Sequence, residues 1–225
     1  MNNEELHVNI INPTEIFAIN RYDDLNIQVH QILNCKILVI DNIFFDVNKV
    51  KEYALSLPYH NNIALTGNAP VFRAMTQPCS IFNSTILNLV QKNLDDSIIF
   101  DTTETVFSYQ SKEMLNHLKF MTPHRDWGED YDMNYAGVIY LTNNCGTSFF
   151  KYDLDFYTDE SIAVTNFYPE QYMKHFHEIG NVEGISNRFV VYDSQLLHRP
   201  DYSRVSDFPY RIIQNFQFIK KSLDN

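Results

Sequence analysis

The sequence has few basic residues for its length, and this shortage argues against one class of function. Among its 225 residues, 17 Lys and Arg stand against 28 Asp and Glu, which gives a formal net charge of −11. A protein that neutralises nucleic-acid phosphates needs a basic stripe, and the chain contains no block rich in Lys or Arg. We therefore expect no nucleic-acid partner, although a localised basic groove stays open as an alternative.

Cysteine, glycine, proline and long apolar runs are also scarce. Cys35, Cys79 and Cys145 form no C-x-x-C pair and no even-numbered disulfide framework, which favours a reducing compartment. The N-terminus lacks the basic and apolar regions of a signal peptide, and no apolar run approaches the roughly 20 residues of a membrane span. Six Gly and eight Pro are too few for a linker or low-complexity protein. These features predict a soluble cytoplasmic protein without a membrane partner.

What the chain does contain is enough apolar and aromatic residues for a large core. Hydrophobic residues make up 44% and aromatic residues 14% of the sequence, close to the globular norm. No repeat and no linker divides the chain, so we expect one domain over residues 1–225.

The first 100 residues predict helices around one buried strand. Residues 37–40 form a short apolar run typical of a buried strand. Asp46 is placed to cap a helix that ends before Pro58, and a second helix is expected from about Ser84 to Leu94. We expect this helix-containing part, residues 1–100, to support the remainder from outside a sheet.

From residue 101 onward the pattern changes to short strands. One helix is expected there, over Tyr168–Ile179, because Pro169 lies in its first turn and Gly180 at its end. A turn is expected at Asn143–Gly146. Short strands separated by turns favour an antiparallel sandwich or jelly roll, and the expected strands are Thr105–Gln110, Leu118–Thr122, Tyr135–Thr142, Ser148–Tyr152, Arg188–Asp193 and Arg211–Ile219.

His124 and Asp126 are the sharpest chemical signal in the sequence. They lie two residues apart after a predicted strand, so both side chains project to the same side of the chain. His198, after the predicted strand Arg188–Asp193, supplies a second imidazole. Two His and one carboxylate form the facial triad of non-haem Fe(II) oxygenases, which leaves coordination positions open. A Zn hydrolase could also use this set, but it would not need the downstream Arg211, whose guanidinium suits a carboxylate-bearing co-substrate.

The order of the motifs resembles the Fe(II)/2-oxoglutarate-dependent oxygenases of the prolyl-4-hydroxylase-like group. The resemblance covers roughly Ile37 to Phe218. Its landmarks, in order, are Val39–Phe44, Phe107–Tyr109, His124-x-Asp126, Ala136–Thr142, Gly146–Phe150, Asn187–Tyr192, His198 and Arg211. The resemblance implies a double-stranded β-helix core, here over residues 101–225. It also implies Fe(II), 2-oxoglutarate and O₂ as cofactor and co-substrates.

The resemblance also assigns roles to individual residues. His124, Asp126 and His198 match the iron ligands, and Arg211 matches the residue that pairs with the distal carboxylate of 2-oxoglutarate. Tyr140 matches a tyrosine that assists at that carboxylate, and Tyr109 matches a strand aromatic near the co-substrate. The interval from His198 to Arg211 is long for the family, which leaves Arg199 and Arg204 as rivals for the Arg role. Arg199 adjoins a ligand, so strand alternation should turn it to the opposite face.

The implied reaction is the oxidative decarboxylation of 2-oxoglutarate to succinate and CO₂, coupled to hydroxylation of an unactivated C–H bond. The substrate would be an amino-acid-like small molecule or a peptidyl residue. Trp127, Asp130 and Asp132 follow the metal motif and could form an acidic, aromatic rim that favours a cationic group. A solvated loop without a specific role is the alternative. A non-catalytic metal-binding jelly-roll module and a Zn hydrolase on a cupin-like barrel also stay open. The sequence indicates no oligomeric state.

Overall fold

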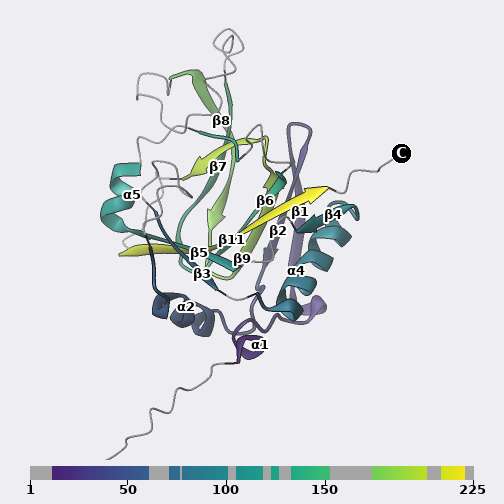
Figure 1. Ribbon diagram of the computed structural model, residues 1–225. Helices are drawn as coiled ribbons and strands as arrows, with labels where there is room; N and C mark the ends of the chain where they lie inside the picture. The colour runs from purple at the N-terminus through teal and green to yellow at the C-terminus, as the bar shows by residue number, and fades with distance from the viewer. Residues whose placement is uncertain are drawn as a thin grey trace, which may run out of the picture.

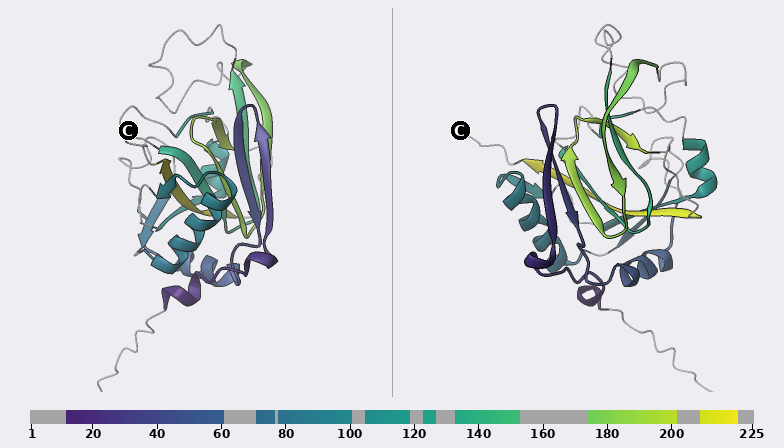
Figure 2. Two further views of the ribbon diagram at one scale, coloured as in Figure 1. Left: turned by 90° about the vertical axis from the view of Figure 1, so that its right-hand side faces the viewer. Right: turned by 180° about the vertical axis from the view of Figure 1, so that it is seen from behind.

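Two antiparallel sheets that face each other form the body of the protein. The computed structural model describes residues 12–60, 71–76, 78–100, 105–118, 123–126, 133–152, 174–201 and 209–220. The large sheet has the order β1-β2-β9-β6-β11-β5-β3, with β4 paired to β11, and the small sheet has the order β10-β7-β8. This arrangement of two sheets confirms the predicted jelly-roll core (Figures 1 and 2).

The strands of the large sheet come from both halves of the chain. They are β1 (Asn26–Ile32), β2 (Cys35–Asp41), β3 (Phe72–Thr76), β4 (Ile98–Phe100), β5 (Thr105–Ser111), β6 (Met133–Tyr140), β9 (Arg188–Asp193) and β11 (Tyr210–Lys220). The first 100 residues therefore contribute strands to the sheet as well as helices that cover it. The small sheet consists of β7 (Asn144–Tyr152), β8 (Phe176–Gly184) and β10 (Leu197–Pro200).

Helices cover the outer face of the large sheet (Figure 2). The described helices are α1 (Pro13–Ile16), the 3₁₀ turn η1 (Tyr22–Asp24), α2 (Val47–Ser56), α4 (Ser80–Asn93) and α5 (Lys112–Leu118). The Asp46 carboxylate caps α2 by accepting from the backbone N–H groups of Asn48 and Lys49, as its position in the sequence predicts. Among the described residues, no helix is long and apolar enough to cross a membrane.

Two apolar clusters lie on the two faces of the large sheet. The outer cluster joins residues of α2 and α4, such as Val50 and Phe82, to outward-facing strand residues such as Phe107 and Ile212. The inner cluster lies between the sheets and includes Val138, Tyr140 and Tyr192 of the large sheet and Phe149 of β7. Because side chains alternate along a strand, this division tells which residues face the space between the sheets.

Two predicted elements are wrong. The helix expected over Tyr168–Ile179 does not form at its described end: residues 174–175 make a 3₁₀ turn and Phe176–Gly184 is strand β8. Gly180 lies inside this strand, where a Cβ atom would come within 2.6 Å of the Ile32 side chain. Pairing with β7 thus outweighs the local helix signal, as tertiary context commonly does.

The strand expected over Leu118–Thr122 is also wrong where the structure describes it. Leu118 is the last residue of α5, and residues 119–122 lie outside the described part. The Ser111 hydroxyl accepts from the backbone N–H of Met114 at 3.2 Å, which caps the start of this helix. The predicted turn Asn143–Gly146 is shorter than expected, because β7 begins at Asn144.

Candidate active site

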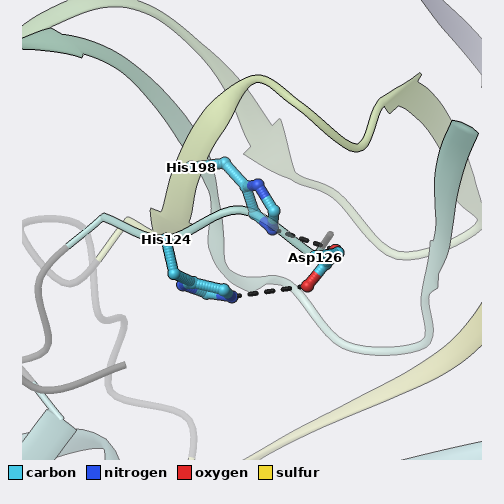
Figure 3. A group of neighbouring side chains, drawn as sticks. All are labelled: His124, Asp126 and His198. Atoms are coloured by element: carbon cyan, nitrogen blue, oxygen red, sulfur yellow. Dashed lines mark ion pairs between the residues drawn. The ribbon is translucent and has the colours of Figure 1, made fainter. Parts of the chain in front are cut away.

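His124, Asp126 and His198 come together at one edge of the space between the sheets (Figure 3). The backbones of His124 and His198 form an antiparallel bridge, in which each N–H donates to the other carbonyl at 2.9 Å. The Asp126 N–H donates to the Ser194 carbonyl at 3.2 Å, in the connection between β9 and β10. These backbone bonds hold residues 123–126 beside β10, which brings together three residues that are separated by up to 74 positions (198 − 124) in the sequence.

The three side chains converge on one point. The Asp126 carboxylate lies 3.5 Å from His124 Nε2 and 3.2 Å from His198 Nε2. One ligand atom from each residue lies within 4.8 Å of the others. His198 Nδ1 is 2.9 Å from the Leu196 carbonyl, so the ring is oriented by its far nitrogen and Nε2 is turned toward Asp126. Two imidazoles and one carboxylate in this arrangement fit a divalent metal ion of the facial-triad type.

The electrostatics of the triad favour the charged form of Asp126. Burial alone would raise the pKa of this carboxyl, but the charge on His198 and hydrogen bonds from both imidazoles hold it well below its usual range. Burial would lower the pKa of His198, and the Asp126 carboxylate outweighs this and raises it. A cation is therefore favoured among these three groups, whether it is a proton or a metal ion.

Arg211 lies on β11 and is buried, with 4% of its surface exposed. Its Nε donates to the Cys145 carbonyl at 3.1 Å and its Nη1 donates to Gln110 Oε1 at 2.9 Å. Within the described part of the chain, no carboxylate pairs with this guanidinium. Because its acceptors are neutral, no negative group balances the charge of this buried guanidinium. It is therefore suited to bind an anion.

Tyr140 accompanies Arg211 on the neighbouring strand β6. Its ring centroid is 5.7 Å from Arg211 Cζ, and its hydroxyl is 2.7 Å from the hydroxyl of Thr147 on β7. The structure thus brings together Arg211 and Tyr140, and it adds Gln110 and Thr147 to them.

Tyr192 connects this polar group to the triad. Its ring centroid lies 4.7 Å from that of His198, and its side chain is buried. Burial raises the pKa of Tyr192, the charges of Asp126 and Tyr140 raise it further, and Arg211 opposes them. Tyr192 belongs to the same inner cluster as Tyr140, and the charges of both Asp126 and Arg211 act on its pKa. The triad and the guanidinium therefore lie in the same space between the sheets. Sequence reasoning missed Tyr192, although alternation with the buried Val190 on β9 was a signal that it faces inward.

Two of the expected residues, Tyr109 and Arg199, have other surroundings. Tyr109 packs against Tyr59 and Tyr210, with ring centroids 5.6 Å and 5.8 Å away, on the outer side of the sheet with Phe107. Its neighbour Gln110 is the residue that contacts Arg211. Arg199 lies over the Phe150 ring, with Cζ 5.1 Å from its centroid, whereas His198 faces the interior. Arg204, Trp127, Asp130 and Asp132 lie outside the described residues.

A cavity of about 760 Å³ adjoins the chain segments that carry the triad. Arg125, between two triad residues, and Leu196 and Leu197, directly before His198, contribute to its wall. Lys151 of β7 and His177 of β8 also line it. Cavities of this size accommodate small-molecule ligands.

A facing pair of antiparallel sheets with an inward His-x-Asp…His set defines the class of fold to which the chain belongs, the double-stranded β-helix. The chain shares this fold with HygX from Streptomyces hygroscopicus, whose structure has nickel and 2-oxoglutarate bound. The TM-score is 0.52, the sequence identity is 12%, and the match covers 82% of this chain and 83% of HygX. A Pseudomonas putida prolyl-4-hydroxylase matches with a TM-score of 0.42 and 14% identity over 76% of this chain and 81% of its own. No known family profile matches the chain, and neither does any curated protein.

Proposed function

We propose that the protein is an Fe(II)- and 2-oxoglutarate-dependent oxygenase that hydroxylates a C–H bond of an amino-acid-like small molecule or a peptidyl residue. The observation that carries the proposal is that a candidate metal-binding triad and a buried, unpaired guanidinium lie in the same space between the two sheets. The His124, Asp126 and His198 ligand atoms lie within 4.8 Å of one another, and the buried Arg211 has only neutral partners in the described chain. A structural metal site has no use for such a guanidinium.

Each group has a defined task in this proposal. His124, Asp126 and His198 hold the metal, with His198 oriented through its contact with the Leu196 carbonyl. Arg211, steadied by Gln110, binds the distal carboxylate of 2-oxoglutarate. Iron held there, with 2-oxoglutarate and O₂, would supply the oxidising chemistry, with succinate and CO₂ as the products of 2-oxoglutarate. The surrounding protein orients the reactants and excludes water.

Tyr140 supports the co-substrate site from β6. Its hydroxyl is paired with Thr147, so the two hydroxyls together can donate one hydrogen bond to a ligand beside Arg211 while the other proton stays between them. The acidic rim of Trp127, Asp130 and Asp132 stays a prediction, whereas Tyr109 lies on the outer face of the sheet and has no place in the proposed co-substrate site. Replacement of Asp130 and Asp132 by Asn, followed by measurement of substrate KM, tests the rim.

The decisive experiment measures 2-oxoglutarate binding and succinate formation. The protein is loaded with Fe(II) without oxygen, titrated with 2-oxoglutarate in a calorimeter, and then exposed to O₂. We expect His124→Ala to lose iron binding, and Arg211→Ala to lower 2-oxoglutarate affinity about tenfold or more with iron still bound. Arg199→Ala is the matched control and should leave that affinity unchanged.

The outcomes separate the proposal from its competitors. No 2-oxoglutarate binding by the iron-loaded wild-type protein would exclude it and favour a metal-binding jelly-roll module. Hydrolytic activity that requires zinc, without succinate, would favour a Zn hydrolase. Loss of 2-oxoglutarate affinity in Arg199→Ala, and not in Arg211→Ala, would move the co-substrate site to the other arginine.

A further inference from the structure

Arg73 is a further guanidinium on the inner face of the large sheet, which also carries Arg211 and Arg188, the latter paired with Asp41. On β3, Ala74 lies opposite Phe107 of β5, whose side chain belongs to the outer cluster, while Arg73 lies opposite Ser108. Because neighbouring positions of a strand face opposite sides, Arg73 shares the inner face with Ser108 and with Gln110, the partner of Arg211.

The Arg73 side chain has no hydrogen-bond or ion-pair partner among the described residues. Its Nε is buried without a hydrogen bond, and no ion pair holds the guanidinium among the described residues. A buried donor without an acceptor is costly, and in native proteins it usually marks an absent ligand, water or ion. Since a guanidinium is charged at any ordinary pH and only donates, the missing partner is an acceptor, most favourably an anion.

Arg73 also lies within electrostatic reach of the triad. Burial lowers the pKa of its guanidinium, and the Asp126 carboxylate opposes that change. Arg73 and Arg211 occupy different strands, β3 and β11, with β5 between them. In the proposed function Arg211 binds the distal carboxylate of 2-oxoglutarate. Arg73 is therefore available to bind a second anionic group.

A cavity adjoins the chain segments that carry the triad, but Arg73 and the three triad residues do not line it. Arg125, Lys151 and His177 line it, and the described part of its wall contains no Asp or Glu. The described wall carries the positive charges of Arg125 and Lys151, in a chain with a net charge of −11.

We propose that Arg73 recognises an anionic group, a carboxylate or phosphate, on the substrate that is hydroxylated at this site. The inference rests on the proposed function, because it takes the ligand beside the triad to be the substrate. It adds to that function a substrate class and the residue that reads it. An amino-acid-like substrate, with its carboxylate, belongs to this class.

The experiment compares an anionic probe with a neutral probe of the same shape. The full-length protein, loaded with Fe(II) and 2-oxoglutarate without oxygen, is titrated into 4-fluorophenylacetate or 4-fluorophenylacetamide, and binding is followed by ¹⁹F NMR relaxation. We expect the wild-type protein to bind the anion about tenfold or more tightly than the amide. Arg73→Gln should abolish the preference, and Arg73→Lys, which keeps the charge, should retain part of it.

Two controls make the result specific. Arg21→Gln removes an exposed arginine and should keep the preference. The affinity of Arg73→Gln for 2-oxoglutarate should equal that of the wild-type protein, and thermal unfolding confirms that each variant is folded. If Arg73→Gln is unfolded, Arg73→Lys takes its place. Its preference for the anion should then be lower than that of Arg21→Gln, and an equal preference would refute the role of Arg73.

The results distinguish this inference from the proposed function. Failure of the wild-type protein to bind 2-oxoglutarate counts against the proposed function itself. If 2-oxoglutarate binds normally but the wild-type protein shows no preference for the anion, or Arg73→Gln keeps it, the role of Arg73 is refuted. A loss of 2-oxoglutarate affinity in Arg73→Gln would assign Arg73 to the co-substrate and refute it as well.

Discussion

Tyr192 supports the triad although it is not one of its three candidate ligands. Its ring lies against the His198 imidazole, with centroids 4.7 Å apart, and its other side meets Phe149 edge-on at 5.3 Å. The ring thus limits the rotation of His198 from one side while the Leu196 carbonyl fixes Nδ1. Mutation of a group that orients a metal ligand typically lowers metal affinity by about 10- to 100-fold.

We therefore expect Tyr192→Ala to weaken metal binding about tenfold, because the imidazole loses its support and must be ordered when the metal binds. Tyr192→Phe keeps the ring and should bind metal as the wild-type protein does. Titration with Fe(II) under anaerobic conditions measures both affinities. Tyr135→Phe, at a half-buried position on the outer side of β6, is the control for removal of a tyrosine hydroxyl on the face away from the triad. Equal metal affinity of Tyr192→Ala and wild-type protein would show that Tyr192 only fills space.

At the residue scale, the sequence was sufficient for local patterns and insufficient for contacts across strands. His124 and Asp126 are two residues apart, so their shared direction follows from strand geometry alone. Gln110 and Arg73 have no such signal. Their positions depend on which face of β5 and β3 points inward, and this is decided by the pairing of those strands with β11 and with each other.

At the scale of elements, the predictions succeeded where a strand is buried on both faces or a helix carries its own cap. Strand β9 has the predicted bounds, Arg188–Asp193, because its central residues are all buried and β-branched or aromatic. Helix α2 begins after Asp46, as expected. Strand β8 was missed because most of its side chains are exposed or only half-buried, so it has no clear apolar alternation. Its place is determined by pairing with β7.

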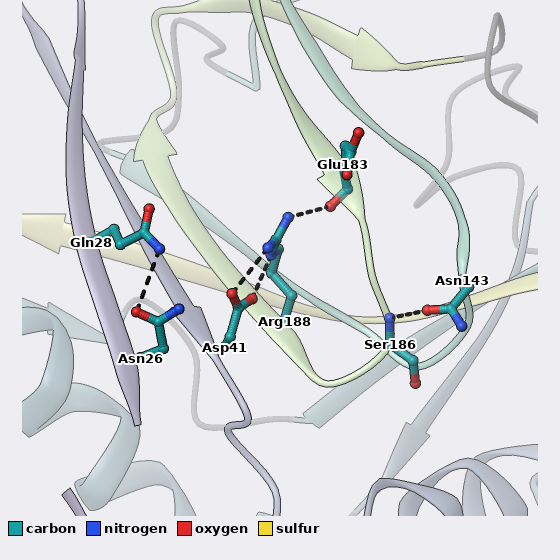
Figure 4. Close-up of polar contacts among 7 residues, drawn as sticks. All are labelled: Asn26, Gln28, Asp41, Asn143, Glu183, Ser186 and Arg188. Carbon is teal, nitrogen blue, oxygen red and sulfur yellow. Dashed lines mark hydrogen bonds and ion pairs between the residues drawn. The ribbon is translucent and has the colours of Figure 1, made fainter. Parts of the chain in front are cut away.

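The pairing of β2 with β9 joins the N-terminal part of the chain to the core, and one ion pair lies on it. Asp41 and Arg188 are register partners on these strands. Arg188 Nη2 donates to Asp41 Oδ2 at 3.0 Å, and Nη1 donates to the Glu183 carbonyl at 3.2 Å (Figure 4). The Asp41 side chain is 26% exposed and the Arg188 side chain 15%, so solvent screens the ion pair only in part.

Arg188 also donates from Nε to Asp41 Oδ1, which makes the ion pair bidentate. Because the pair is bidentate but partly solvated, we expect Asp41→Asn to lower the free energy of unfolding by about 1 kcal/mol. Chemical denaturation at low and high salt measures the loss, which should shrink as salt screens the charges. Asp23→Asn, an exposed acid in η1, is the matched control and should change little. A loss that does not depend on salt would point to packing and not to the ion pair.

At the scale of the whole molecule, charge is unevenly distributed between outside and inside. The chain has a net charge of −11, yet Arg211 and Arg73 face the space between its sheets. Under the proposed function, an anionic co-substrate enters an acidic protein and needs a cation inside to be retained. The sheets hold these cations in place, because each arginine lies on a strand with backbone pairing on both sides: β11 between β5 and β6, and β3 between β5 and the bridge to His60.

The same architecture predicts that metal binding stabilises the folded protein. The triad joins residues 123–126 to β10 by backbone hydrogen bonds between His124 and His198, and a bound ion adds a second connection that the unfolded chain cannot form. At a free metal concentration about 100 times Kd, the stabilisation should be about 2.7 kcal/mol. We expect a chelator to lower the unfolding temperature of the metal-loaded wild-type protein and to leave that of His124→Ala unchanged.

This stabilisation should also depend on pH in a defined direction. In the metal-free protein the Asp126 carboxylate raises the pKa of His198. Proton-linked stability from His198 is therefore fully present below its ordinary pKa of about 6.5 and is lost as pH rises through the raised value. Because a metal ion replaces that proton, the increment from metal should be smallest at acidic pH and grow across this window. Thermal unfolding with and without metal at several pH values measures it, and an increment independent of pH would show that His198 does not exchange a proton for the metal.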